Sequence, residues 1–278
     1  MQPSLFFVDE TFDINNRKNY NISIQCSLDG FSFSVFDTLL NKFIVLADYY
    51  LICASPFQLK NEIAEIISNQ EIISSGYKHA YINFVTQKTL IVPEALTQNY
   101  EETIFSFTFE KDRNEVIINN RLLNGKSLLS ALPSVLKDFF TSYFNNVSFY
   151  SPCYPLADQL NTKAPRHSTL HLQLHNHILF IAGTVKHEIK TLNAYYIKNE
   201  NDILFYTLRL AKSLDFDNNT ELILSGSFDK NSPSKRELTR YFETINYARF
   251  SHRYAVSYTF MKKPEHIYLP LMNLALCE

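Results

Sequence analysis

Residues 22–35 read ISIQCSLDGFSFSV, in which apolar and polar side chains alternate on both sides of a turn at Leu28-Asp29-Gly30. Alternation with a period of two is typical of half-buried strands, so this stretch predicts a hairpin. A strand over 42–51 follows. Ser55-Pro56 then opens a helix, because serine is a good N-cap and proline fits the first turn. A strand over 80–85 completes the unit.

The same order of elements recurs in the second half. Residues 169–175 read TLHLQLH, with leucine at every second position, and His175-Asn176-His177 form the turn. Strands over 178–185 and 188–197, a helix beginning at Asn201 or Asp202, and a short strand over 221–224 follow. Residues 22–85 and 169–225 are therefore predicted to be two copies of one unit, roughly 145 positions apart, and such a duplication narrows the fold strongly.

The middle of the chain is less regular. Residues 103–109 alternate, with Phe105, Phe107 and Phe109 on one face, and predict a strand whose hairpin partner is 115–119. We therefore expect an inserted strand pair near 97–124. Leucines and aromatic residues over 128–144 have helical spacing and predict a helix with Pro133 in or near its first turn.

Composition excludes several classes of protein. The chain has 278 residues and a net charge of −2, so no basic field suggests nucleic acid. The four cysteines form no C-x-x-C pair, which argues against a metal knuckle. The apolar run 43–54 is interrupted by Asp48 and is too short to span a bilayer. The N-terminus lacks the pattern of a signal peptide, and we expect a cytoplasmic protein.

The repeated meander, helix and strand resemble the actin-like ATPase fold shared by actin, sugar kinases and heat-shock chaperones. In the bacterial branch of this fold that contains PilM and FtsA, a strand is followed by a hairpin and a Leu/Val-Pro step. A similar order of elements is found here in residues 81–85, 89–92 and Pro93-Glu94-Ala95-Leu96. Residues 116–145 and 156–160 resemble the strand and helices that close the first half in that branch. We expect an uncharacterised bacterial family with this fold.

The resemblance implies an α/β protein with a duplicated actin-like ATPase (ribonuclease H-like) fold, in which two subdomains have mixed sheets flanked by helices. We expect the first subdomain over 1–165 and the second over 166–278. The two should meet near 160–168 with a cleft between them. No Gly/Ser linker separates the halves, so they should pack together.

Relatives that bind ATP hold its phosphates with one glycine-containing turn per half, and an acid on each first strand organises Mg²⁺. The first turn here keeps Asp29, Gly30 and Ser32, but the acid lies one residue before the glycine instead of two. Phe31 also replaces a small residue where a phosphate would lie. An ordinary Asp-Gly hairpin turn is the competing interpretation.

The second turn, His175-Asn176-His177, has neither acid nor glycine. Ser225-Gly226-Ser227 resembles the motif that packs on adenosine, with its second glycine replaced, although a strand that ends in a glycine turn explains it equally well. The candidate vestigial nucleotide site therefore consists of Asp29, Gly30, Ser32, Ser225 and Gly226. We assign no catalytic residue, because no acid is paired with a nucleophile.

A metal centre is a further alternative, because four histidines lie close together in the sequence: His167, His171, His175 and His177. Zinc needs three or four ligands in tetrahedral geometry, and a solvated or cleft-facing strand explains these histidines more simply. We expect no metal. The function that these patterns favour is a non-catalytic interaction or assembly module with a protein partner and no cofactor. The alternative is an ATP-binding protein or slow ATPase that uses ATP with Mg²⁺.

Overall fold

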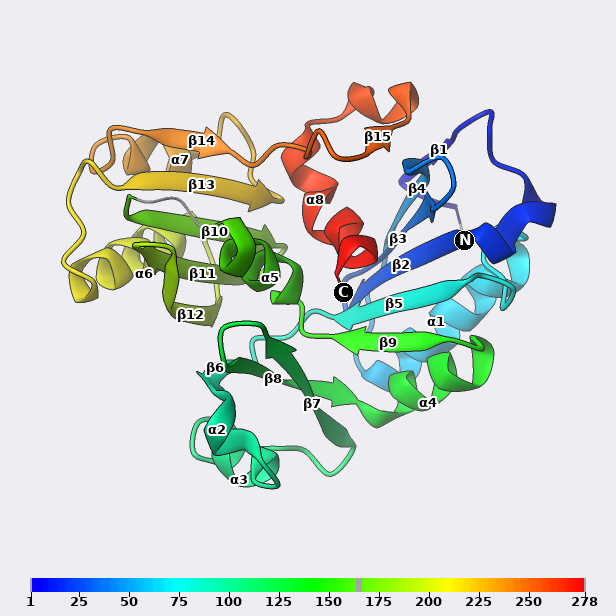
Figure 1. The fold of residues 1–278 in the computed structure, drawn as a ribbon, viewed down its shortest axis with the longest axis horizontal. Coiled ribbons are helices and arrows are strands. Elements are labelled where there is room, and N and C mark those ends of the chain that lie inside the picture. Colours follow the sequence, from blue (N-terminus) through cyan, green and yellow to red (C-terminus); the bar gives the residue numbers. More distant parts are fainter. Residues whose placement is uncertain (1, 164–166, 278) are drawn as a thin grey trace.

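The computed structural model describes residues 2–163 and 167–277. Two twisted sheets lie side by side, a small third sheet lies below them, and helices cover the outer faces (Figure 1). The first sheet has the strand order β1-β4-β3-β2-β5-β9, and the second has the order β12-β11-β10-β13-β14. The third sheet has the order β6-β8-β7.

The strands are β1 (Leu5–Val8), β2 (Tyr20–Ser27), β3 (Gly30–Asp37), β4 (Lys42–Tyr50), β5 (His79–Phe84), β6 (Thr89–Pro93), β7 (Glu115–Leu122), β8 (Lys126–Pro133), β9 (Val147–Tyr150), β10 (Thr169–His175), β11 (Ile178–Val185), β12 (Glu188–Tyr196), β13 (Glu221–Gly226), β14 (Ile245–Tyr247) and β15 (Ala255–Val256). The helices are α1 (Pro56–Asn69), α2 (Glu94–Thr97), α3 (Glu101–Ser106), α4 (Ser134–Tyr143), α5 (Tyr154–Lys163), α6 (Glu200–Ser213), α7 (Pro233–Leu238) and α8 (Glu265–Asn273). Short 3-10 helices are η1 (Ile14–Asn19), η2 (Tyr258–Lys262) and η3 (Leu274–Leu276).

The predicted duplication is confirmed by the topology. The order β2-β3-β4-α1-β5 in the first half matches β10-β11-β12-α6-β13 in the second. In each half the first three strands are antiparallel and the fourth pairs in parallel with the first, as β2 does with β5 and β10 with β13. The shared topology is that of a mixed sheet.

Alternation along β2 separates two environments. Ile22 and Ile24 are fully buried in a core that includes residues of α1 and α4. The intervening Ser23 and Gln25 are also buried, on the opposite face of the sheet. That face is covered by the C-terminal segment, because α8 contacts β2 and β3. The polar face of the first sheet is therefore an interior surface.

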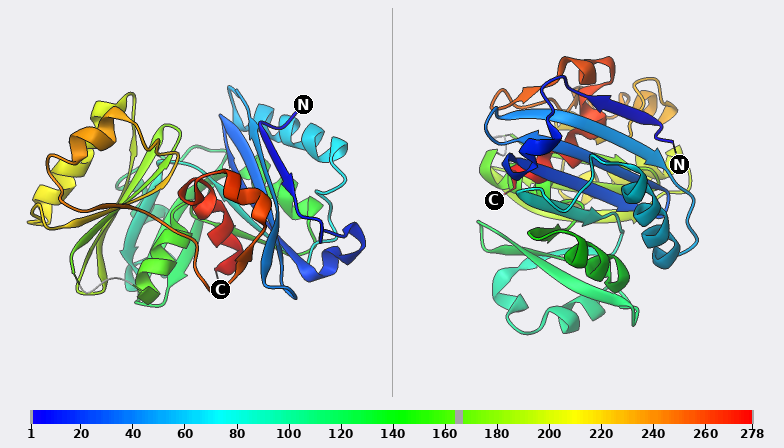
Figure 2. Two further views of the ribbon diagram at one scale, coloured as in Figure 1. Left: turned by 90° about the horizontal axis from the view of Figure 1, so that it is seen from above. Right: turned by 90° about the vertical axis from the view of Figure 1, so that its right-hand side faces the viewer.

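The C-terminal segment returns from the second half to the first. β15 pairs in parallel with β4, and Phe260 and Leu271 pack in one cluster with Phe43. Seen from above, α8 lies between the two large sheets (Figure 2), and it contacts β13 as well as β2 and β3. The expected second subdomain, 166–278, therefore includes residues that pack with the first sheet. The expected boundary itself lies outside the described residues.

Two sequence predictions in the middle of the chain are wrong. Residues 101–106 form helix α3 and not half of an inserted strand pair near 97–124, and β7 pairs with β8 instead. The helical geometry separates Phe105, which is fully buried, from Phe107, which is 82% exposed. The stretch predicted to begin a helix at Leu128 is strand β8, and the helix begins only at Ser134.

Candidate functional site

The tips of the two equivalent hairpins contact each other. Ser27 pairs with Gly30 across a two-residue loop, and His175 pairs with Ile178 in the same way in the second half. His175 Nδ1 lies 3.0 Å from Gln25 Nε2, and its Nε2 lies 3.4 Å from Ser27 Oγ. Because an amide nitrogen can only donate, Nδ1 accepts from Gln25 and Nε2 carries the proton toward Ser27. A neutral histidine thus bridges the halves.

Burial lowers the pKa of His175, and the carboxylates of Asp29 and Asp48 oppose that shift only in part. This direction agrees with the neutral form that the two hydrogen bonds require. The bridge is therefore suited to neutral pH, where the imidazole of the second half accepts from Gln25 and donates to Ser27, both in the first half.

A cavity of about 120 Å³ lies beside this bridge. Its lining residues come from the two hairpins, from β4, from the residue after β13 and from α8: Gln25, Asp29, Gly30, Ser32, Asp48, Tyr49, Tyr50, His175, Asn176, Ser227, Ile267, Tyr268 and Leu271. No lysine or arginine is among these described lining residues. Helix α8 therefore closes the space between the hairpins with apolar and aromatic side chains.

The two carboxylates of the cavity already have partners. Ser27 Oγ donates to Asp29 at 2.5 Å, and Ser32 Oγ donates to Asp48 at 2.5 Å. Burial raises the pKa of Tyr268 to about 12, and the nearby charge of Asp48 contributes to the rise. The cavity thus combines two hydrogen-bonded acids with a neutral phenol and a neutral imidazole.

The structure brings together three of the five predicted site residues. Asp29, Gly30 and Ser32 line the cavity, although the acid is displaced by one position from the pattern of the family. Phe31 does not enter the cavity. It is fully buried in the core on the other face of the sheet, where it contacts Phe33 and Tyr49. The expectation that the bulky side chain of Phe31 lies where a phosphate would lie is therefore wrong, because strand alternation directs this side chain to the other face.

The other two predicted residues lie elsewhere. Ser225 lines a separate cavity of about 280 Å³, together with His171 and Gln173 and beneath α5 and α8. Gly226 has φ +79°, and a Cβ atom there would lie 2.0 Å from the carbonyl oxygen of Leu174. The close approach of β13 to β10 therefore explains this glycine without a ligand.

The four clustered histidines have different partners. His167 bonds Glu221 at 2.7 Å, His171 bonds Thr169 at 3.0 Å, and the ring of His177 lies beside Tyr196. Burial lowers the pKa of His171 from 6.5 to about 4, with Glu221 opposing. Within residues 2–163 and 167–277, no group of three or more His, Cys, Asp or Glu side chains is arranged to hold a metal ion.

Sequence reasoning missed most of the other residues that line the cavity, among them Gln25, Asp48, Tyr268 and Leu271. The polar face of β2, which carries Gln25 next to Ser23 and Ser27, was a usable signal. Nothing in the sequence connects α8 with the first hairpin, because that contact joins positions more than two hundred residues apart. Of the helices in the described part of the chain, none has the length and apolar content needed to cross a membrane.

Comparison with solved structures identifies the fold. A protein with actin-like ATPase fold and unknown function from Bacteroides thetaiotaomicron VPI-5482 superposes with a TM-score of 0.82 at 18% identity, over 96% of this chain and 100% of that one. The PilM-PilN type IV pilus biogenesis complex superposes with a TM-score of 0.64 at 11% identity, over 92% of this chain and 97% of that one. These likenesses show a shared actin-like ATPase fold.

No curated protein matches the sequence. Residues 9–245 match the model of the family described as protein of unknown function (DUF3822). The match covers most of the chain, including both copies of the repeated unit. The chain is therefore a member of the DUF3822 family, a family of unknown function, and it has the actin-like ATPase fold.

Proposed function

We propose that this protein is a non-catalytic actin-like module that works by binding a protein partner. One observation carries the proposal: His175 joins the two hairpin tips through Gln25 and Ser27, and only about 120 Å³ remains between them. Sites for small molecules usually measure about 300–1,000 Å³. In this arrangement the protein's own side chains take the space where relatives bind phosphates.

The chemistry of the cavity also disfavours a nucleotide. A triphosphate carries several negative charges, and the lining supplies two carboxylates and no lysine or arginine. The second turn has Asn176 and His177 where the resemblance implies an acid and a glycine. One of the two phosphate-binding turns is therefore missing. The residues present therefore do not fit ATP with Mg²⁺, and we propose that the protein has no cofactor.

The relative with the same fold supports a role in assembly. PilM is observed in a complex with PilN in type IV pilus biogenesis. We propose that this chain likewise uses its fold as a scaffold for a partner. The proposal includes a cytoplasmic location, which four buried free thiols favour because an oxidising compartment promotes disulfides. Cell fractionation with an antibody against the protein tests that location.

A second candidate function is an ATP-binding protein or slow ATPase. It is favoured by one observation, that Asp29, Gly30 and Ser32 share a cavity with Ser227. Such a protein would have to break the His175 bridge and displace α8 before a nucleotide could enter.

Phosphate release from ATP in the presence of Mg²⁺ separates the two candidates. We expect the purified protein to release phosphate no faster than a buffer control. Turnover that is lost in Asp29→Ala and kept in Asp217→Ala, an acid on a loop distant from the cavity, would replace the proposed function with the ATPase.

A further inference from the structure

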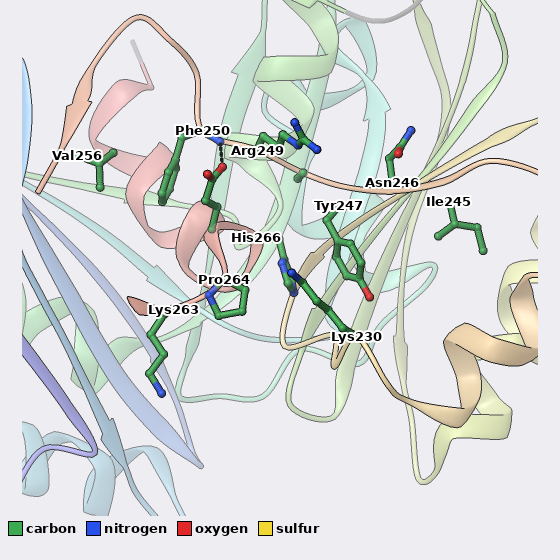
Figure 3. Close-up of a pocket in the computed structure, with 12 residues that line it drawn as sticks. Lys230, Ile245, Asn246, Tyr247, Arg249, Phe250, Val256, Lys263, Pro264 and His266 are labelled. Carbon is green, nitrogen blue, oxygen red and sulfur yellow. Dashed lines mark hydrogen bonds between the residues drawn. The ribbon is translucent and has the colours of Figure 1, made fainter. Parts of the chain in front are cut away.

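A groove of about 510 Å³ runs along the outer strand of the second sheet (Figure 3). Six consecutive residues, 245–250, form one wall, which consists of β14 and the chain that follows it. The start of α8 and the segment before it form the other wall, with Val256, Pro264 and His266. The groove is separate from the cavity between the hairpin tips, since the two share no lining residue.

The backbone of β14 has an open edge at this groove. β14 is the last strand of its sheet among the described residues, and it pairs with β13 alone. Leu222 N donates to Thr244 O, and Ala248 N donates to Leu224 O, so every second residue of this wall bonds β13. In a parallel ladder the residues between them direct both backbone groups the other way. Ile245 and Tyr247 therefore present N–H and C=O groups to the open side.

The groove is positively charged although the chain as a whole is not. Lys230, Arg249 and Lys263 line it, and all three side chains are exposed. Glu265 is the one acid among the described lining residues, and its carboxylate accepts the backbone N–H of Phe250 at 3.0 Å. Burial lowers the pKa of His266, which therefore adds no charge at neutral pH. The groove therefore carries more positive than negative side chains, in a protein whose net charge is −2.

Aromatic rings provide an apolar floor between these charges. The rings of Tyr247 and His266 lie side by side with centroids 4.3 Å apart. Lys230 Nζ lies 5.9 Å from the centre of the Tyr247 ring, within cation–π range. An extended peptide could therefore direct one side chain onto this floor and its neighbours toward the lysines.

We propose that the groove binds an acidic segment of a partner protein, which adds to β14 as a further strand. The inference deepens the proposed function and rests on it, because it names the surface and the chemistry of the partner. The open backbone edge supplies the main-chain hydrogen bonds, and the three cations select acidic side chains. A second copy of this chain does not fit, because pairing β14 with β14 would bring two cationic grooves together.

Selection from a random dodecapeptide library against the whole protein tests the proposal. We expect the enriched peptides to be rich in Asp and Glu alternating with apolar residues. The best peptide, fluorescently labelled, should bind Lys230→Glu/Lys263→Glu at least ~tenfold more weakly than the wild type, and its affinity should fall as salt rises. Lys137→Glu/Lys212→Glu makes the same charge change on exposed residues of α4 and α6 and should bind like the wild type.

A second measurement uses only the wild-type protein. Methylating alternate backbone nitrogens of the peptide removes its edge hydrogen bonds, so one of the two methylation registers should weaken binding at least ~tenfold. Enrichment of neutral or basic peptides, no enrichment, equal binding in both registers, or a preference for a single-stranded oligonucleotide would overturn the proposal. ATP turnover with normal peptide binding would instead overturn the proposed function and leave the groove in place.

Discussion

The two hairpins of this molecule have the same backbone and different chemistry. Each joins its strands by a two-residue loop, and each first strand lies beside a parallel neighbour. The first hairpin keeps Asp29 and Gly30, whereas the second has Asn176 and His177 at its tip. The fold thus depends on strand alternation and register and not on the turn residues. The turn residues of the two halves can therefore differ while the topology persists.

Gly30 in the first half and Gly226 in the second differ in how much space their backbone leaves for a side chain. Gly30 does not have a positive φ, and a Cβ there would have only ordinary contacts at 3.6 Å with Ser27 and Tyr49. Gly226 has no such freedom, because Leu174 O occupies the place of its Cβ. The backbone around Gly30 therefore leaves room for a side chain, whereas the backbone around Gly226 at the end of β13 does not.

Of the substitutions that compare the two halves, one at Gly226 should have the largest effect on the free energy of unfolding. Gly226→Ala should lower the free energy of unfolding by about 3 kcal/mol or more, because it combines a strained positive φ with a backbone clash. Gly30→Ala should change it by less than about 0.5 kcal/mol. Urea denaturation measures both. Equal losses at the two positions would show that the hairpins do not differ in this way.

Burial of His171 in the second half should make the protein less stable in acid. His171 has a pKa of about 4 when folded and 6.5 when free, so only the unfolded chain takes up a proton between these values. The stabilisation is complete above pH 6.5 and is lost as the pH falls toward 4, by about 2 kcal/mol at pH 5. Denaturation midpoints from pH 7.5 to 5 measure this slope. His171→Gln should flatten it, and an unchanged slope would contradict the burial of this imidazole.

The bridge between the hairpins should have a smaller effect. His175→Ala removes the hydrogen bonds to Gln25 and Ser27 and should lower the free energy of unfolding by about 1–2 kcal/mol. His177→Ala, at the exposed tip of the same turn, should cost less than about 0.5 kcal/mol. Thermal unfolding compares the two variants. If His177→Ala were the more costly of the pair, His175 would not join the two halves.

Local patterns predicted the repeated unit well. The alternation over 22–35 and 169–175, and the cap at Ser55 that accepts from the backbone of Gln58, are confirmed. Asp29, Gly30 and Ser32 also lie together at one cavity, because a hairpin fixes which neighbours share a face. These features depend on residues close in sequence.

The misses have a common physical cause. Residues 103–109 alternate like a strand, but tertiary packing of Phe105 against Leu129 and Ala131 in one small core stabilises a helix. The closure of the cleft by α8 depends on contacts between distant parts of the chain, and no local period encodes them. The hydrogen bond that joins His175 to Gln25 likewise involves residues 150 positions apart.

Calorimetric titration of the wild-type protein with ATP and Mg²⁺ tests the central claim, that the space between the hairpins is filled by the protein itself. We expect no saturable heat and no gain in thermal stability. A ligand that binds only the folded state at 100 times its dissociation constant would add about 2.7 kcal/mol. Saturable binding that Asp29→Ala abolishes and His177→Ala preserves would contradict the account and establish a nucleotide site between the hairpins.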